Sequence, residues 1–197
     1  TMNGSSYEEG AFMFNCPQII PKIKCRVFSN ELVMFEEFAD FVRNFDPDII
    51  AGYEVNSSSW GYLIDRSRAI YEFDFVPELS RVHFKSHSKM GDHWGYTHTS
   101  AIKICGRHVL NIWRPLRSLN LLKYTIENVS YHALHERVPH FTNKTLTEMF
   151  SQDFLSLASH FLKKLELDAR LIETQELITR AAEEARLIGI DFYDVYY

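Results

Sequence analysis

The sequence lacks the features of a membrane-spanning, disulfide-stabilised or secreted protein. No run approaches the ~18 apolar residues that cross a bilayer, and the start has no basic region followed by an apolar stretch. The three cysteines, Cys16, Cys25 and Cys105, are odd in number and far apart, which argues against a disulfide framework or a structural zinc site. We therefore expect a soluble, intracellular chain with no membrane partner.

An excess of positive charge is also missing. The 21 basic and 26 acidic residues give a formal charge of −5 and are mixed along the chain. The chain as a whole therefore has no electrostatic attraction for a polyanion, and any contact with nucleic acid must be local. Its 197 residues, 46% of them hydrophobic, suffice for a substantial core, which excludes a disordered chain.

The order of elements in the first half predicts an α/β fold. Short strands are expected at 11–15 and 23–28, followed by an amphipathic helix that starts at Glu31 behind a Ser29 or Asn30 cap. Asp46-Pro47 stops this helix, and the apolar run 49–51 ending at Gly52 is typical of a buried strand. A serine run, 57–59, then predicts a capped second helix from Trp60.

The second half is expected to be mostly helical. Strands at 101–105 and 109–113 around Gly106 suggest a hairpin, and helices are predicted over 125–136, 144–163 and 168–188, the last capped by Gly189. We expect a partly irregular upstream segment, 1–22, and one domain, 23–197.

The stretch Asp46-Pro47-Asp48-Ile49-Ile50-Ala51-Gly52-Tyr53-Glu54 resembles the second exonuclease motif of B-family DNA polymerases. That motif is D-P-D-x-x-x-G-Y-N, followed five residues later by an aspartate that helps to bind two catalytic metal ions. Here Glu54 replaces the Asn, and Ser59 stands where the aspartate belongs. A neutral hydroxyl is a poor ligand for Mg²⁺, so the resemblance implies that one metal carboxylate is missing.

A second resemblance lies near the C-terminus, where 170–190 is similar to the helix after the third exonuclease motif. Alignment without a gap puts His160 at the motif tyrosine and Lys164 at its metal-binding aspartate. The first motif, Asp-x-Glu, is not found. The resemblance therefore implies a partial RNase H-like (DnaQ-type) exonuclease fold with degenerate positions at Glu54, Ser59, His160 and Lys164, and with no catalytic, cofactor-binding or metal-binding residue.

Further segments resemble a translesion branch of the same family, among them Ser59-Trp60-Gly61-Tyr62-Leu63 and Gly106-Arg107-His108. This resemblance implies a nuclear parent that is a DNA-directed DNA polymerase (a nucleotidyltransferase), which contacts DNA and accessory subunits. It also implies that Mg²⁺ and an iron–sulfur cluster lie elsewhere in the parent, with no cofactor in this part, whose role would be structural.

Two alternatives stay open. One is an active metal-dependent 3′–5′ exonuclease with relocated ligands such as Glu54, Asp65 or Asp168; the other is a binding module for DNA or protein without catalysis. Five arginines are candidates for a basic strip facing phosphates, although the sequence does not show that they converge. They are Arg66, Arg68, Arg107, Arg114 and Arg117.

Several clusters are assigned ordinary structural roles. His83, His87, His93 and His98 fit no usual metal-ligand spacing and are interpreted as part of a polar loop. His132 and His135 are expected on a helix surface. The aromatic residues Tyr53, Trp60 and Trp113 are assigned to the core rather than to base stacking, and Asp46 and Asp48 to a structural role.

Overall fold

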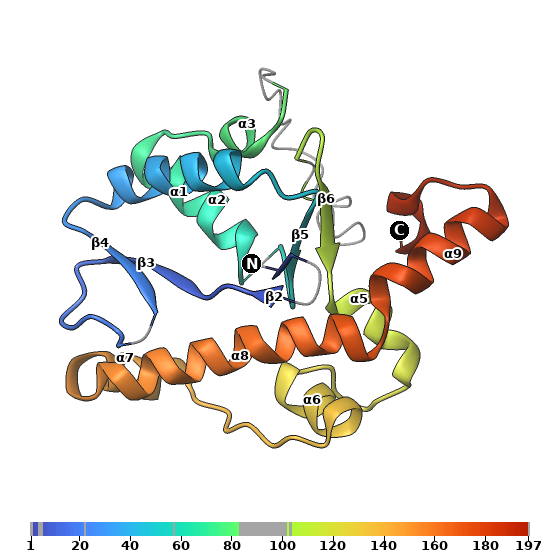
Figure 1. Cartoon of the computed structure of the whole chain (residues 1–197). Coiled ribbons are helices and arrows are strands. Elements are labelled where there is room, and N and C mark those ends of the chain that lie inside the picture. The colour runs from blue at the N-terminus through green and yellow to red at the C-terminus, as the bar shows by residue number, and fades with distance from the viewer. Residues whose placement is uncertain are drawn as a thin grey trace.

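The protein has a mixed α/β fold with a helical C-terminal part (Figure 1). The computed structural model describes residues 2–3, 6–21, 23–56, 58–82, 102 and 104–196. The described strands are β1 (Met2–Asn3), β2 (Ser6–Tyr7), β3 (Gly10–Phe14), β4 (Lys24–Phe28), β5 (Ile49–Gly52) and β6 (His108–Asn111). The described helices are α1 (Glu31–Phe45), α2 (Trp60–Tyr71), α3 (Phe75–Leu79), α5 (Trp113–Leu116), η1 (Arg117–Leu119), α6 (Ile126–Leu134), α7 (Asn143–Gln152), α8 (Phe154–Thr174), α9 (Leu177–Ile188) and η2 (Phe192–Tyr196).

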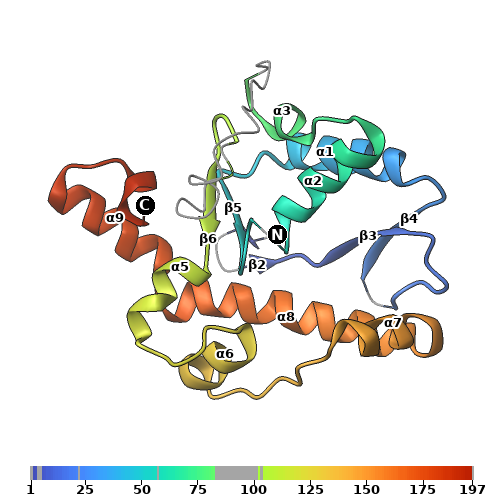
Figure 2. The same cartoon turned by 180° about the vertical axis from the view of Figure 1, so that it is seen from behind.

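The parallel pair β5–β6 lies between two layers of helices, as Figures 1 and 2 show from opposite sides. Successive side chains of a strand point to opposite faces. Ile50 and its partner Val109 therefore enter one core, which α1, α2 and α3 complete. Ala51 and its partner Leu110 face a second core, built with α5, α6, α8 and α9. The two cores share one short sheet.

The helix α1 begins and ends as the sequence predicts. The Asn30 side chain accepts a hydrogen bond from the Leu32 amide at 3.0 Å, which satisfies one of the free N–H groups at the helix start. Asp46 ends the helix in the left-handed region with φ of 49°, and its amide donates to the Val42 carbonyl. The helix therefore delivers the chain directly into β5.

The predicted hairpin at 101–105 and 109–113 is wrong. β6 pairs in parallel with β5, and the His108 amide donates to the Asp48 carbonyl at 2.8 Å. Ile104 lies in a turn closed by a hydrogen bond from the Arg107 amide, while residues 101 and 103 lie outside the described residues. Local turn signals suggested an antiparallel partner nearby, whereas a strand buried on both faces can take a distant parallel one.

The helix predicted at 125–136 is confirmed by α6, but the predicted division between the helices at 144–163 and 168–188 is wrong. A break falls at Asp153, whose carboxylate accepts from the Ser156 amide at 3.1 Å and caps α8. From there α8 runs without interruption to Thr174, and Glu176, with φ of 49°, separates it from α9. The apolar periodicity is continuous across Asp153, so the cap and not the pattern sets this boundary. The predicted cap at Gly189 is confirmed, with φ of 79°.

Two further expectations concern histidines and the membrane. His132 and His135 are exposed on or next to α6, which confirms their assignment to a helix surface. The cluster His83, His87, His93 and His98 lies outside the described residues. Among the residues that the structure describes, no helix is long and apolar enough to cross a membrane.

Candidate functional site

The turn after β5 carries the positions that correspond to the second exonuclease motif. The hydroxyls of Ser58 and Ser59 donate to the Glu54 carbonyl oxygen at 3.1 and 2.9 Å, and the Asn56 amide donates to the Glu54 carboxylate at 3.3 Å. Ser59 precedes α2 but its side chain makes no capping bond there, contrary to the sequence prediction. The Ser59 hydroxyl therefore holds the turn closed.

The same turn is fitted around two glycines. A Cβ atom on Gly52 would lie 2.8 Å from the Ser59 hydroxyl oxygen, and one on Gly61 would lie 1.7 Å from the Asn56 carbonyl oxygen. The Trp60 indole N–H donates to the Ala51 carbonyl at 3.1 Å, so the start of α2 is fixed against β5. Close backbone approach is what requires glycine at these positions.

Asp46 and Asp48, the first acids of the motif, contact arginines. Arg81 bonds the Asp46 and Asp48 carboxylates at 2.8 Å each, and the buried Arg107 bonds Asp46 at 2.8 Å and the Pro47 carbonyl. Hydrogen bonds from Arg81, and then from Arg107, hold the pKa of Asp46 below its usual value. These acids join the end of α1 to the turn before β6, which is the structural role expected of them.

Lys164, which the motif alignment predicts at the third-motif aspartate position, forms an ion pair with Glu127. Its ammonium lies 3.2 Å from the Glu127 carboxylate of α6, and the His140 ring nitrogen lies 3.3 Å from the same oxygen. Burial favours the neutral form of Glu127, but its backbone hydrogen bond, Lys164 and His140 outweigh this effect and lower its pKa. Glu127 is therefore a carboxylate with a cation beside it.

His160, which the motif alignment predicts at the position of the motif tyrosine, is buried on α8. Its ring packs edge-on against Phe141, with 4.9 Å between centroids, and against Phe161 at 5.8 Å. Burial lowers the pKa of His160, and the charge of Lys164 lowers it further. The neutral imidazole therefore packs as an aromatic ring between α8 and the 135–142 segment.

Asp168 lies one helical turn after Lys164. Among the described residues, its Oδ1 has no hydrogen-bond partner. Burial raises the pKa of Asp168 to about 7, and the charge of Lys164 opposes the shift. Burial also raises the pKa of Tyr53, and the charges of Asp168 and Glu127 raise it further. We call Tyr53, Glu127, Lys164 and Asp168 the charged cluster.

The charged cluster connects the two motif regions through Tyr53. Its hydroxyl donates to the Tyr124 carbonyl at 2.8 Å, and the next residue, Glu54, begins the turn that carries Ser59. Asp65, a proposed relocated ligand, is exposed on α2 and takes no part. Within the described ranges, no three His, Cys, Asp or Glu side chains gather closely enough to hold a metal ion.

Sequence reasoning missed Glu127, the partner of Lys164, and His140, which contacts the same Glu127 oxygen. Glu127 is visible as an acid in the first turn of a helix, a position that the helix dipole favours. Its contact with Lys164 of α8, which lies 37 positions later in the sequence, is set by tertiary packing.

The five arginines do not form a strip. Arg66 pairs with Glu31 at 2.9 Å, Arg68 pairs with Asp74 at 3.0 Å, and Arg107 is buried against Asp46. Arg114 is half-buried, and Arg117 is exposed with its guanidinium 5.2 Å from the ring centre of Trp113. Trp60 and Tyr53 pack against the first and second core, as predicted.

Residues 3–129 match the family model described as DNA polymerase family B, exonuclease domain. The chain therefore belongs to the B-family DNA polymerases, and its matched part is an exonuclease domain of that family, as the motif resemblance predicted.

Among individual proteins, the chain is similar to the DNA polymerase zeta catalytic subunit of Saccharomyces cerevisiae, with 41% identity over 196 residues. It is 36% identical over 176 residues to the zeta catalytic subunit of Homo sapiens, and 27% identical over 188 residues to the DNA polymerase delta catalytic subunit of Drosophila melanogaster. These alignments cover 96%, 85% and 90% of this chain, but only 13%, 6% and 17% of the relatives. The similarity to zeta catalytic subunits agrees with the assignment of segments such as 59–63 and 106–108 to one branch of the family.

The two metal ions implied by the exonuclease resemblance do not fit the residues present. At position 59 a serine hydroxyl is bonded within its own turn, and at position 164 an ammonium is paired with Glu127. Mg²⁺ prefers anionic oxygen ligands in near-octahedral geometry, and neither position supplies one. We derive no reaction step through these metals.

Proposed function

We propose that this chain is the inactivated proofreading-exonuclease-like domain of a translesion DNA polymerase catalytic subunit, with an RNase H-like (DnaQ-type) fold and a structural role. The observation that carries the proposal is the ion pair between Lys164 and Glu127 at 3.2 Å. The ion pair supports the proposal because the motif alignment predicts a metal-binding carboxylate at position 164, where this chain has an ammonium group.

An unpaired ammonium at position 164 would repel a metal ion strongly, and in the ion pair the Glu127 carboxylate is already engaged by Lys164. Two like unit charges ~4 Å apart repel by about 4 kcal/mol at an effective dielectric of 20, and a divalent ion roughly doubles this value. Ser59 offers no compensating charge. The site would lack the carboxylate at position 59 and would carry a positive instead of a negative charge at position 164. One relocated acid nearby cannot compensate for both changes.

The expected parent is a DNA-directed DNA polymerase that acts in the nucleus on damaged DNA together with accessory subunits. Support comes from the names of the zeta catalytic subunits, found in yeast and human. The parent would carry its Mg²⁺ and iron–sulfur sites outside this domain. The domain would pack against the polymerase part and help to shape the DNA channel.

The inactivation is tested by incubating the chain with an end-labelled single-stranded oligonucleotide and Mn²⁺ or Mg²⁺. We expect no metal-dependent shortening of the oligonucleotide by the wild type or by Lys164→Ala. The matched variants are Glu54→Gln and Asp168→Asn, which remove the acids of the relocated-ligand alternative. Cleavage by the wild type that either of these variants abolishes would reject the proposal.

The structural role needs the full-length polypeptide. Gly61→Ala, which forces a Cβ atom to within 1.7 Å of the Asn56 carbonyl oxygen, should disrupt this domain without touching the polymerase part. We expect reduced amounts of assembled polymerase and reduced primer extension. If assembly and extension are unchanged while the isolated chain with Gly61→Ala is destabilised, the domain has no structural role.

A further inference from the structure

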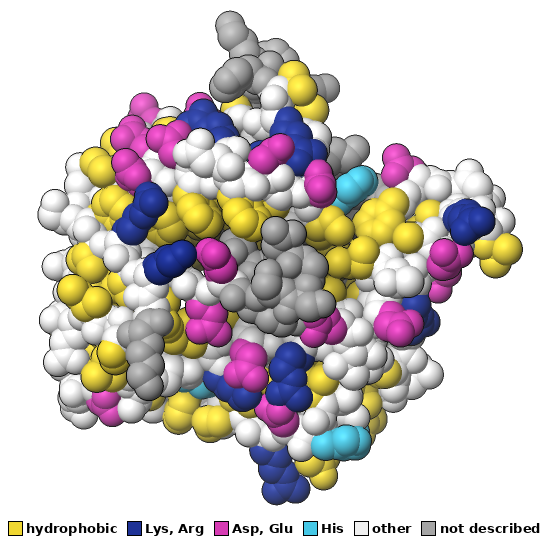
Figure 3. Space-filling model, in the orientation of Figure 1, with side chains coloured by type: hydrophobic (Ala, Val, Ile, Leu, Met, Phe, Trp, Pro, Cys, Tyr) yellow, Lys and Arg dark blue, Asp and Glu magenta, His cyan; other side chains and the backbone are white. Residues whose placement is uncertain are grey.

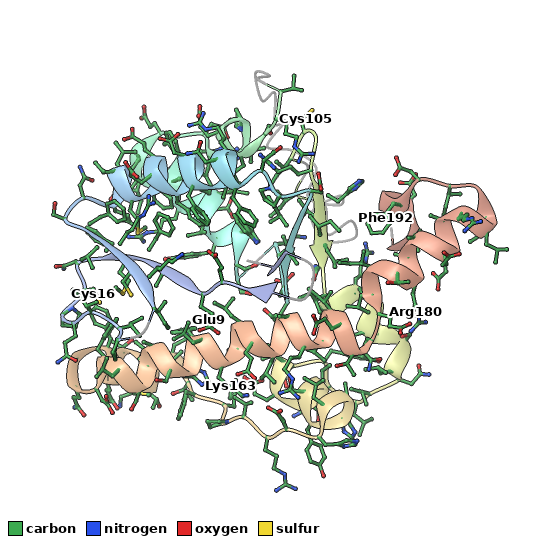
Figure 4. All side chains as sticks on the ribbon, viewed as in Figure 1. Glu9, Cys16, Cys105, Lys163, Arg180 and Phe192 are labelled. Atoms are coloured by element: carbon green, nitrogen blue, oxygen red, sulfur yellow. The ribbon has the colours of Figure 1, made fainter. Side chains whose placement is uncertain are left out.

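Most of the lysine and arginine side chains that the structure describes form ion pairs. On α8, Lys163 lies 3.1 Å from Glu136 and 3.0 Å from Glu166, and Arg170 pairs with the same Glu136. Lys163, labelled in Figure 4, projects from the side of α8 that faces away from β3 in that view. Because their charges are already neutralised by carboxylates, such paired cations attract an outside anion only weakly.

The segment 113–142 differs from the rest of the chain in charge. It contains four Lys and Arg residues, three His and two acids, so its formal charge is 4 − 2 = +2, against −5 for the whole chain and hence −7 for the remainder. The two acids, Glu127 and Glu136, turn toward α8 and pair with cations there. They do not neutralise the outer surface of the segment.

Three exposed cations of the segment surround α6. Among the residues that the structure describes, no carboxylate lies within ion-pair distance of Arg117, Lys123 or Arg137. The Arg117 carbonyl accepts from the Tyr124 hydroxyl at 3.0 Å, and the Lys123 carbonyl accepts from the Asn128 side chain at 2.7 Å. Both cations are thereby tied to the start of α6, and Arg137 follows its end.

Aromatic rings lie beside two of these cations. The guanidinium of Arg137 lies 5.0 Å from the ring centre of Tyr131, which is 42% exposed on α6. The guanidinium of Arg117 lies over Trp113 at 5.2 Å. The exposed side of α6 also carries His132 and has no acid. Figure 3 shows cationic, histidine and hydrophobic side chains together at the lower edge of the molecule, over α6.

We propose that the α6 surface, formed by Arg117, Lys123, Tyr131, His132 and Arg137, binds the phosphate backbone of single-stranded nucleic acid. Its cations flank a nine-residue helix that is about 14 Å long. The interleaved aromatic rings favour a single strand, whose unpaired bases can stack, over an acidic peptide. The proposal needs neither a metal nor nuclease activity, so it does not depend on the proposed function.

The binding test uses fluorescence anisotropy of a dye-labelled oligothymidylate of about 20 nucleotides, in EDTA, at several salt concentrations. Three phosphate contacts predict that log K falls with log salt with a slope of about −2. The triple variant Arg117→Glu, Lys123→Glu, Arg137→Glu should weaken binding at least tenfold.

The control is the triple variant Lys24→Glu, Arg180→Glu, Arg186→Glu, which changes the net charge by the same −6, from −5 to −11. These cations are exposed outside the α6 surface, and Arg180 is labelled on α9 in Figure 4, well separated from α6. We expect less than a threefold loss in the control. Equal losses in both triple variants, or no salt-dependent binding by the wild type, overturn the proposal.

A competition experiment and a folding control complete the test. A polyglutamate peptide that displaces the oligonucleotide at equal concentration would identify an acidic protein as the partner and overturn the proposal. If circular dichroism shows that the charge-reversed variant is unfolded, the milder Arg117→Gln, Lys123→Gln, Arg137→Gln variant replaces it, with an expected loss of at least fivefold.

Discussion

Lys164 stabilises a carboxylate that would otherwise be buried alone. The Glu127 side chain is only 13% exposed, and its carboxylate lies 3.2 Å from the Lys164 ammonium and 3.3 Å from the His140 ring nitrogen. Removing one partner of a buried pair leaves the other charge without compensation. We therefore predict that Lys164→Met lowers the free energy of unfolding by about 2 kcal/mol, measured by urea denaturation.

Two variants control this prediction. Lys163→Met removes an ion pair whose acids are 31% and 45% exposed, and should cost less than about 1 kcal/mol. Adding Glu127→Gln to Lys164→Met removes the unpaired charge and should restore most of the loss. No difference between Lys164→Met and Lys163→Met would contradict the assigned role of Lys164.

Asp168 makes the stability of the protein depend on pH. Its pKa is about 7 in the folded state and near 4 in the unfolded state, so the folded state holds the proton more tightly. The stabilisation from this proton is present below about pH 4 and is lost as the pH rises to about 7. Asp168→Asn should therefore raise the free energy of unfolding by about 2 kcal/mol more at pH 8 than at pH 5.

The measurement is urea denaturation of Asp168→Asn and wild type at both pH values. The matched control is Asp65→Asn, an exposed acid on the other side of the sheet, which should give the same difference from wild type at pH 5 and pH 8. A pH-independent effect of Asp168→Asn would show that Asp168 is ionised throughout the range.

At the scale of elements, helix α2 depends on a glycine that helix propensity would disfavour. Gly61 lies in the first turn of α2, where alanine normally stabilises by about 1 kcal/mol. The Cβ atom of alanine would lie 1.7 Å from the Asn56 carbonyl oxygen, so the turn must open. We predict a loss of more than about 2 kcal/mol for Gly61→Ala in urea denaturation.

Gly189→Ala is the control that separates the steric clash at Gly61 from the cost of placing alanine in a left-handed backbone conformation. Gly189 has φ of 79° and open space where a Cβ atom would stand. Its replacement should cost about 1 kcal/mol through left-handed strain alone. Stabilisation by Gly61→Ala would mean that the turn between Glu54 and Trp60 is not as tight as described.

Local signals were sufficient for several of these elements and insufficient for their pairing. The Asn30 cap, the stop at Asp46 and the cap at Gly189 each depend on residues within four positions, and all three were predictable. The parallel partner of β5 lies more than fifty residues away, and the sequence suggested a neighbouring hairpin instead. Pairing at that distance is decided by how the two helical layers pack.

The charged cluster shows the same limit. Motif alignment placed Lys164 and Ser59 at degenerate positions, and the charge argument followed from residue type alone. The partner Glu127 and the burial of Asp168 depend on α6 and α8 packing together, which no local pattern encodes. Long-range neighbours decide pKa shifts, so the electrostatics of these positions could not be predicted from the sequence.

At the scale of the whole molecule, one two-stranded sheet serves both cores. Ile50 and Val109 belong to the first core, and the adjacent Leu110 belongs to the second. Loss of either helical layer exposes one face of β5–β6, and an isolated two-stranded sheet is marginally stable at best. We therefore predict that the two cores unfold together.

The test uses two single-tryptophan proteins, both carrying Trp94→Phe. Trp60 packs against the first core, whereas Trp113 follows β6, and its amide donates to the Tyr53 carbonyl at 3.0 Å, beside the second core. Keeping either tryptophan and replacing the other by phenylalanine gives a fluorescence reporter for each core. In each protein the fluorescence midpoint in urea should coincide with the circular dichroism midpoint, because a shared sheet makes unfolding cooperative. A Trp113 transition that precedes the loss of circular dichroism would instead define the C-terminal helical layer as a separate folding unit.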